Sequence, residues 1–181
     1  MAKFVIKEKT KIFVGKFISV WQTEFLDKAG NTKYWEWVER HNAAFIFPIT
    51  RDQKAVLIKN YRVPIEKYVI EMPAGLIDKK GEDELETAKR ELLEETGYRA
   101  KNFIPLRPRG ATLSRNLNFT FIATDLEKVA DHVEGDDTED LEVIEVPLDG
   151  LLDFYHNLPE DILFSLDILA VAAIARQRGI K

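Results

Sequence analysis

The sequence predicts an α+β fold in which a mixed β-sheet lies between helices. Two observations predict it. Alternating and short apolar segments, which are typical of strands, fill most of the first 71 residues and recur after residue 101. Two segments with helical periodicity, 82–96 and 159–178, flank the later strands. A chain of 181 residues also has room for a substantial core.

Strands account for the first part of the chain, because short apolar or alternating runs stand there between turn residues. The turn residues DKAGN (27–31) and TRDQK (50–54) predict two hairpins, the second of which joins 43–49 to 55–61. The predicted strand segments are 4–25, 34–39, 43–49, 55–61 and 68–71.

The segment 82–96 is the clearest helix. Leu85, Ala88, Leu92 and Leu93 form its apolar stripe, and Gly97 provides a C-terminal stop. The later elements are predicted strands at 102–106, 117–123 and 141–146, an acidic loop at 134–140, and helices at 150–156 and from Pro159 to about residue 178. The residues of the last helix that we expect to point inward are Ile162, Leu166, Leu169, Ala173 and Ile174.

Composition excludes several classes of function. The formal net charge of −5 argues against a nucleic-acid surface, and the absence of cysteine excludes disulfides and cysteine nucleophiles. Three scattered histidines form no zinc cluster. No apolar run reaches membrane-spanning length and the N-terminus has no signal-peptide core, so we expect a cytoplasmic protein without a membrane partner.

Three glutamates near the end of the predicted helix indicate a cation site. Glu91, Glu94 and Glu95 are spaced i, i+3 and i+4, which places them on one helical face, where like charges repel. Hard divalent ions such as Mg²⁺ take oxygen ligands and accompany phosphate substrates. The helix alone fits a solvated acidic surface equally well.

The residues around this helix resemble the Nudix box. The match runs from Gly75 through Glu82 to the segment RELLEETGY (90–98). Seven residues separate Glu82 from Arg90, as in that signature, whereas six rather than five separate Gly75 from Glu82. One extra residue in an exposed loop accounts for this difference.

The resemblance implies a Nudix α/β/α sandwich with a central mixed sheet, and an enzyme that hydrolyses a nucleoside diphosphate linked to another moiety. Carried over by position, Glu91 and Glu95 are the main Mg²⁺ ligands, with Mn²⁺ as a substitute, and Glu94 lies close or bridges through water. The same resemblance makes the carbonyl of Ala74 a metal ligand. It also makes Arg90 a residue that orients the glutamates.

The segments VLIKNYRVP and EMPAGLID, together with the C-terminal helix, resemble the ADP-ribose and nucleoside diphosphate sugar pyrophosphatases. This resemblance implies that residues 1–42 form an antiparallel hairpin region that joins two subunits in a homodimer. Residues 43–181 would then form the Nudix domain. Arg62 matches an arginine that contacts substrate or the dimer interface, and a guanidinium suits a diphosphate. An ordinary surface arginine is the alternative.

The segment RGATLSRNLNF (109–119) departs from the ADP-ribose relatives. Asn116 stands where those relatives carry a glutamate that helps to bind the distal sugar, and the expected proline is missing. This departure argues against strict ADP-ribose specificity. Arg109 and Arg115 are candidates for phosphate contacts, with solvated surface positions as the alternative.

The base and the nucleobase contact also follow from the resemblance. In this branch a loop glutamate before the next strand activates water. Glu139 is our first candidate and Asp137 our second, while a solvated acidic loop is the alternative. Trp35 and Trp37 lie two residues apart and therefore share a strand face. That face either stacks a nucleobase or packs in the core or the dimer interface.

We therefore predict a Mg²⁺-dependent homodimeric hydrolase that cleaves a nucleoside diphosphate sugar, such as ADP-ribose or GDP-mannose, to a nucleoside monophosphate and a sugar phosphate. One alternative is hydrolysis of a triphosphate, a dinucleoside polyphosphate or coenzyme A. Another is a Nudix module that binds ADP-ribose without hydrolysing it, although such modules usually lose the box glutamates that this chain keeps.

Overall fold

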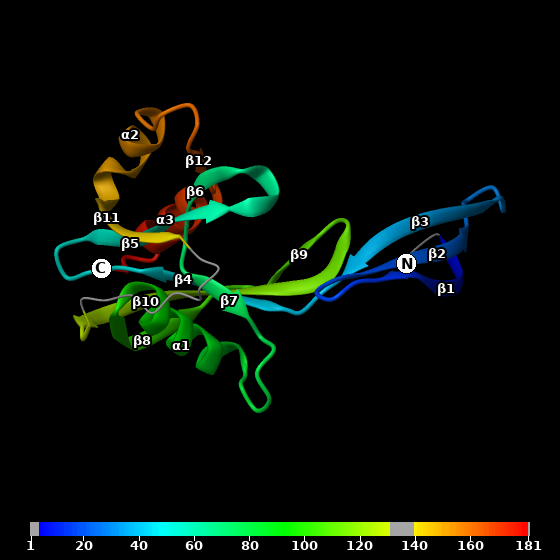
Figure 1. Cartoon of the computed structure of the whole chain (residues 1–181), viewed down its shortest axis with the longest axis horizontal. Helices are drawn as coiled ribbons and strands as arrows, with labels where there is room; N and C mark the ends of the chain where they lie inside the picture. Colours follow the sequence, from blue (N-terminus) through cyan, green and yellow to red (C-terminus); the bar gives the residue numbers. More distant parts are fainter. Residues whose placement is uncertain (1–3, 131–139, 181) are drawn as a thin grey trace. The chain divides into compact units, whose positions relative to one another are not determined.

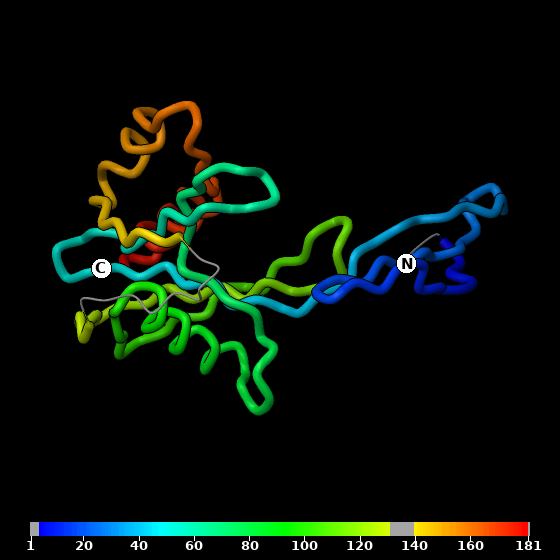
Figure 2. The backbone as a smooth tube through the Cα atoms, in the orientation of Figure 1, coloured from blue at the N-terminus to red at the C-terminus, as the bar shows by residue number. Residues whose placement is uncertain are grey.

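The computed structural model describes residues 4–130 and 140–180, which form two compact units. The first unit combines Met1–Asn42 with Pro108–Asn118, and the second combines Ala43–Arg107 with Phe119–Lys181. Figure 2 shows that the first unit draws on two stretches of chain, one blue and one green. None of the helices in the described ranges has the length and apolar character needed to cross a membrane.

The first unit is a sheet whose strands pair antiparallel except for one parallel contact between β3 and β10, at Val38 and Ser114. It contains β1 (Val5–Val14), β2 (Ser19–Leu26), β3 (Thr32–Glu39), β9 (Arg109–Ala111) and the first residues of β10 (Ser114–Lys128). The predicted turn joins β2 to β3, because Asp27 Oδ1 accepts hydrogen bonds from the backbone N of Ala29 and of Asn31, both at 2.9 Å. Gly30 allows the turn by taking a φ of 84°. The first predicted hairpin is therefore confirmed.

The second unit contains two sheets and three α-helices within the described residues. Its strands are β4 (Ala43–Pro48), β5 (Lys54–Arg62), β6 (Lys67–Glu71), β7 (Ala74–Leu76), β8 (Tyr98–Pro105), the rest of β10, β11 (Leu141–Pro147) and β12 (Leu163–Phe164). Its helices are α1 (Glu84–Thr96), α2 (Leu151–His156) and α3 (Asp167–Gln177), with 3-10 turns η1 (Val63–Ile65) and η2 (Leu148–Gly150). One sheet places β10 beside β4 and β8 and places β4 beside β7, and the other has the order β11-β5-β6-β12.

The helices of this unit cover opposite faces of the strands. Ala88 and Leu92 of α1 are fully buried in a cluster with Ile46 and Val56. Neighbouring residues point to the other face, so Phe47 packs in a second cluster that contains residues of α2 and α3. Figure 1 shows α1 on one side of these strands and α2 on the other. The predicted α+β class is confirmed.

The second predicted hairpin is wrong. β4 and β5 belong to different sheets and share only a single bridge between Ile49 and Ala55, while β5 pairs with β6 and β11. The reason is that both strands are buried on both faces. Continuous apolar runs of this kind carry no pattern that identifies the partner strand.

The last helix is shorter than predicted. It begins at Asp167 rather than Pro159, and β12 lies between them and pairs in parallel with β6. Its buried residues are Ile168, Val171 and Ala175, whereas Leu166 is 60% exposed. Of the residues predicted to point inward, Ile162 and Leu169 do pack against the core cluster, whereas Leu166 and Ala173 are exposed. The predicted face is therefore only partly right, because the apolar residues of 159–178 fit more than one helical phase.

Candidate active site

Helix α1 is fixed at both ends by its own sequence. The Asp83 carboxylate accepts hydrogen bonds from the backbone N of Leu85 and Glu86, at 3.0 and 2.9 Å. At the other end Gly97 takes a φ of 71° and donates its N–H to the Leu93 carbonyl at 2.9 Å. The helix therefore starts two residues later than predicted, and Glu82 stands in the loop before it.

Arg90 is the centre of a cluster of carboxylates. Its Nε lies 3.1 Å from both carboxylate oxygens of Glu82, and its Nη1 donates to Glu91 and Glu94, each at 2.7 Å. Burial alone would lower the pKa of Arg90, but the hydrogen bond to Glu94 and the nearby charge of Glu91 raise it above its ordinary value. One guanidinium thus sets the orientation of three carboxylates.

Glu91 lies against Gly75 in a confined space. A Cβ added to Gly75 would lie 1.8 Å from Glu91 Oε1 and 2.0 Å from its Cδ. The Glu91 side chain is only 13% exposed, and burial raises its pKa although Arg90 acts in the opposite direction. The sequence analysis identified Gly75 as the glycine of the box but did not predict that it leaves space for Glu91. The only signal for this role was the position of the glycine directly after Ala74.

Glu95 connects the helix to the first residue of β7. Its Oε2 accepts a hydrogen bond from the Ala74 backbone N at 2.8 Å, and the residue is 5% exposed. Ala74, which was predicted from sequence as a metal ligand, therefore lies beside a predicted carboxylate ligand.

The donor chemistry of this cluster fits a hard divalent cation, because Glu91, Glu94 and Glu95 offer carboxylate oxygens and the Ala74 backbone offers a carbonyl. The positions of these side chains do not yet form a metal site. Within 4–130 and 140–180, no three side chains of the types His, Cys, Asp or Glu are gathered closely enough to hold a metal ion. Arg90 neutralises Glu91 and Glu94 here.

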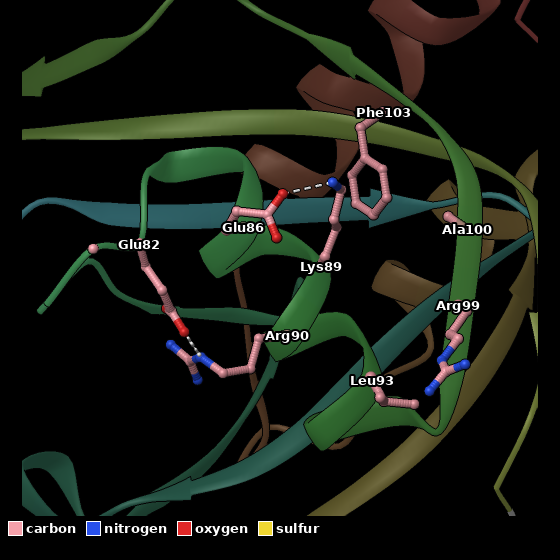
Figure 3. A pocket seen from close by; sticks show the side chains of 9 residues that line it. Glu82, Glu86, Lys89, Arg90, Leu93, Arg99, Ala100 and Phe103 are labelled. Atoms are coloured by element: carbon pink, nitrogen blue, oxygen red, sulfur yellow. Dashed lines mark hydrogen bonds and ion pairs between the residues drawn. The ribbon is translucent and has the colours of Figure 1, made fainter. Parts of the chain in front are cut away.

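A pocket of about 580 Å³ lies between α1 and β8 (Figure 3). Glu86, Lys89 and Leu93 of the helix and Phe103 of β8 line it. Glu86 is paired with Lys89 there, at 2.7 Å. Arg90 also reaches this pocket, and the figure shows its contact with Glu82, but Glu91, Glu94 and Glu95 are not among the lining residues.

Arg62 is held by a carboxylate that the sequence reasoning did not single out. Its Nε donates to Glu71 Oε2 at 2.8 Å, and its Nη2 donates to the same oxygen. The two residues stand on adjacent antiparallel strands, β5 and β6. The sequence analysis did not pair these two strands, so it gave no signal that would have identified Glu71 as the partner of Arg62.

The predicted aromatic residues lie in the first unit. Trp37 stacks on Trp21 with ring centroids 5.5 Å apart, and the Arg115 guanidinium lies 5.7 Å from the Trp37 ring centroid. Trp35 and Trp37 share a strand face, as predicted, and together with Arg115 they line a pocket of about 320 Å³. Lys9 also lines this pocket, and an aromatic surface with cationic side chains is a chemical match for a nucleotide.

The remaining predicted residues have different surroundings. Asn116 is 4% exposed, accepts a hydrogen bond from Arg40 Nε at 3.1 Å and contacts Ser114 and Asn118. Its carboxamide is thus engaged by neighbours within the first unit. Arg109 lies half-buried on β9. Glu139 and Asp137, our candidates for the base, lie outside the described residues.

Comparisons with known proteins agree with this geometry. Residues 39–164 match the family model for the NUDIX domain. The chain is 32% identical over 146 residues to the ADP-ribose pyrophosphatase of Bacillus subtilis, covering 80% of this chain and 78% of that protein. It is 30% identical over 183 residues to the methanol dehydrogenase activator of Bacillus methanolicus, covering 98% of this chain and 97% of the relative.

A solved structure shares the fold. The crystal structure of an ADP compounds hydrolase superposes with a TM-score of 0.79 at 25% identity, covering 100% of this chain and 98% of that one. With the box residues assembled around Arg90 and a family model matched over most of its length, the chain belongs to the Nudix domain family.

Proposed function

We propose that this chain is a Nudix pyrophosphohydrolase that cleaves a nucleoside diphosphate sugar of the ADP-sugar type into a nucleoside monophosphate and a sugar phosphate. The observation that carries the proposal is the cluster in which Arg90 binds Glu82, Glu91 and Glu94. Relatives named ADP-ribose pyrophosphatase and ADP-sugar pyrophosphatase support the substrate class.

Nudix hydrolases generally use divalent metal ions. We assign Mg²⁺ to the carboxylates of Glu91, Glu94 and Glu95 and to the Ala74 carbonyl, with Mn²⁺ as a substitute. When bound, such an ion neutralises diphosphate charge and polarises the phosphorus.

The protein's own residues then position the reactants. Arg90 keeps the carboxylates in fixed orientations through its hydrogen bonds. Arg62 presents a guanidinium whose planar fork suits diphosphate oxygens, and Glu71 holds that guanidinium in place. Hydrolysis joins a water oxygen to one phosphorus and breaks the bridging P–O bond, so a base must accept the proton that the water loses. We assign this role to Glu139, with Asp137 as the second candidate.

We further propose that the enzyme is a homodimer joined through its N-terminal hairpin region. Large apolar side chains are exposed on β1 and β3, among them Ile6 at 55% and Trp35 at 54%. Surfaces of this kind on soluble proteins mark interaction sites. Since the sequence resemblance implies a dimer whose sites use both chains, the same face serves two purposes: we place Trp35, Trp37, Arg109, Arg115 and Asn116 where the hairpin region contacts the nucleotide or the sugar.

A panel of nucleotide sugars tests the function. With Mg²⁺ present we expect ADP-ribose or a related ADP-sugar to yield a nucleoside monophosphate, measured by chromatography, and we expect chelation with EDTA to abolish turnover. Glu94→Gln and Glu95→Gln should each lower kcat about 100-fold while the thermal midpoint changes little. Glu86→Gln on the exposed side of the same helix is the matched control and should retain activity. A folded protein that turns over no sugar nucleotide would reject the proposal.

A second candidate function is hydrolysis of a different nucleoside diphosphate derivative. The observation that favours it is the engaged carboxamide of Asn116 at the position expected for a sugar-binding glutamate. Rates on a nucleoside triphosphate, a dinucleoside polyphosphate and coenzyme A, measured beside ADP-ribose, separate the two.

A further inference from the structure

Asn60 is a buried polar residue whose acceptor has no partner. The residue lies on β5, is 1% exposed, and among the described residues its Oδ1 makes no hydrogen bond. Leaving a buried acceptor without a partner costs about 1–3 kcal/mol, so buried carboxamides are normally satisfied. Directly across the neighbouring strands stand Val69 and Leu141, whose side chains offer no donor.

Asn60 lies on the face of the sheet that looks toward α1. Val56 of the same strand packs with Ala88 and Leu92 of that helix. Residues two apart on a strand share a face, so this face carries Val56, Asn60 and then Arg62. The alternate residue Leu57 packs in the other cluster, on the α3 side.

The same face carries the ion pair of Arg62. Glu71 stands opposite Ile58 in the β5–β6 register, which puts its side chain on the face of Asn60. A single row of side chains thus leads from the contact with α1, past Asn60, to the guanidinium assigned to the diphosphate. This location separates Asn60 from an ordinary core position.

We propose that Asn60 positions the reactants by accepting, at Oδ1, a hydrogen bond from an O–H donor of the reacting complex. The inference rests on the proposed function, which supplies two such donors: the water consumed in hydrolysis and a hydroxyl of the sugar. Either donor satisfies the orphan acceptor only when substrate is bound. The free-energy cost of the unpartnered Oδ1 in the free protein is then offset in the complex. A destabilising group of this kind can be kept because it serves function.

The experiment removes the acceptor without removing the bulk. Asn60→Leu is nearly isosteric, and Asn60→Val, which suits a strand, replaces it if the leucine variant does not fold. Thr50→Val is the matched control, because Thr50 is also buried but its hydroxyl bonds with Asp52 and Lys54. The measurements are the thermal midpoint without substrate, and kcat and KM for ADP-ribose and ADP-glucose.

We expect Asn60→Leu to keep or raise the thermal midpoint and to lower kcat/KM at least about tenfold. We expect the opposite pattern from Thr50→Val, with a lower midpoint and normal kinetics. An equal fall of kcat for both substrates identifies the water as the donor. A rise of KM for one substrate identifies the sugar hydroxyl.

Two results overturn the inference. If Asn60→Leu retains kcat/KM within twofold on a substrate that the wild type turns over, Asn60 binds at most a structural water, and the proposed function stands. If the thermal midpoint and the activity fall in parallel, the residue is structural. A wild-type protein without turnover rejects the proposed function itself, and the inference fails with it.

Discussion

The carboxylate of Glu91 occupies the space in which any side chain at position 75 would have to lie. A Cβ built on Gly75 comes within 1.8 Å of Glu91 Oε1 and within 2.6 Å of its Cγ. The glycine is therefore required by a side chain of the next helix, and its own backbone φ imposes no such need. This contact holds β7 against a predicted metal ligand.

We predict that Gly75→Ala displaces Glu91 and lowers kcat about 100-fold. The added methyl group should also cost about 1–3 kcal/mol of unfolding free energy, because it overpacks a confined region. Steady-state kinetics and urea denaturation measure the two effects. Gly150→Ala is the matched control, since the nearest atom to its Cβ is 3.9 Å away, and it should leave both quantities unchanged. Normal kinetics in Gly75→Ala would show that the position of Glu91 is unimportant.

A second prediction concerns the guanidinium of Arg90. Arg90→Lys keeps the positive charge but cannot contact Glu82, Glu91 and Glu94 at once, because an ammonium lacks the planar fork. We expect a 10- to 100-fold fall in kcat with a smaller change in KM, about the range found for residues that orient metal ligands.

Lys89→Met provides the comparison for Arg90. It removes the neighbouring cation, whose pair with Glu86 is exposed and should contribute no more than about 0.5 kcal/mol. This variant should keep full activity. Equal kinetics for Arg90→Lys and the wild type would mean that charge alone, rather than geometry, is what Arg90 supplies.

Local signals in the sequence were sufficient for the first hairpin and for α1. Asp27 and Gly30 specify a turn through their own chemistry, and Asp83 and Gly97 cap the helix in the same way. Each of these features depends on residues close together in the chain. The box residues were equally accessible, because Arg90 lies one helical turn from Glu94.

What escaped prediction depends on partners far apart in the chain. The pairing of β5 with β11 joins residues more than 80 positions apart, and neither apolar run contains a pattern that specifies the other as its partner. The pair of Arg62 with Glu71, the contact of Gly75 with Glu91 and the orphan acceptor of Asn60 all require knowledge of which strand faces share a side. Sequence periodicity predicts which residues share a face of a strand or helix, but it does not predict which other element packs against that face.

A third prediction is a pH dependence of stability that originates at Tyr98. Its hydroxyl donates to Glu145, and burial together with this hydrogen bond raises the pKa of Tyr98 to about 12 from 10.0. The hydrogen bond from Tyr98, assisted by Lys54, lowers the pKa of Glu145 below its ordinary 4.5. Between pH 4.5 and pH 10, where Tyr98 is neutral and Glu145 is ionised, this pair contributes its full stability to the folded state. This stability is lost as pH rises from 10 to about 12, and as pH falls below 4.5.

Tyr98→Phe should reduce the unfolding free energy by about 1.5–3 kcal/mol at pH 7, the range for hydrogen bonds to charged groups. The difference between variant and wild type should shrink toward pH 12. Urea denaturation across this pH range measures it. Tyr155→Phe, at a more exposed tyrosine, is the control and should show no such trend. A difference that stays constant with pH would exclude ionisation of Tyr98 as its origin.

The last prediction concerns assembly through the first unit. Phe4, Ile6, Phe25, Trp35 and Trp37 line an apolar pocket of about 270 Å³. If this face joins two subunits, light scattering during size-exclusion chromatography should give about 42 kDa, twice the chain mass of 20.9 kDa.

Trp35→Glu places a charge on this face and should yield a monomer, because burying an unpaired carboxylate opposes association. Tyr34→Glu alters an equally exposed aromatic on the opposite face of β3 and should leave the dimer intact. We also compare specific activity as the protein is diluted. If it falls on dilution for Trp35→Glu but stays constant for Tyr34→Glu, the site needs both chains. A wild-type protein of 20.9 kDa at micromolar concentration would contradict the dimer.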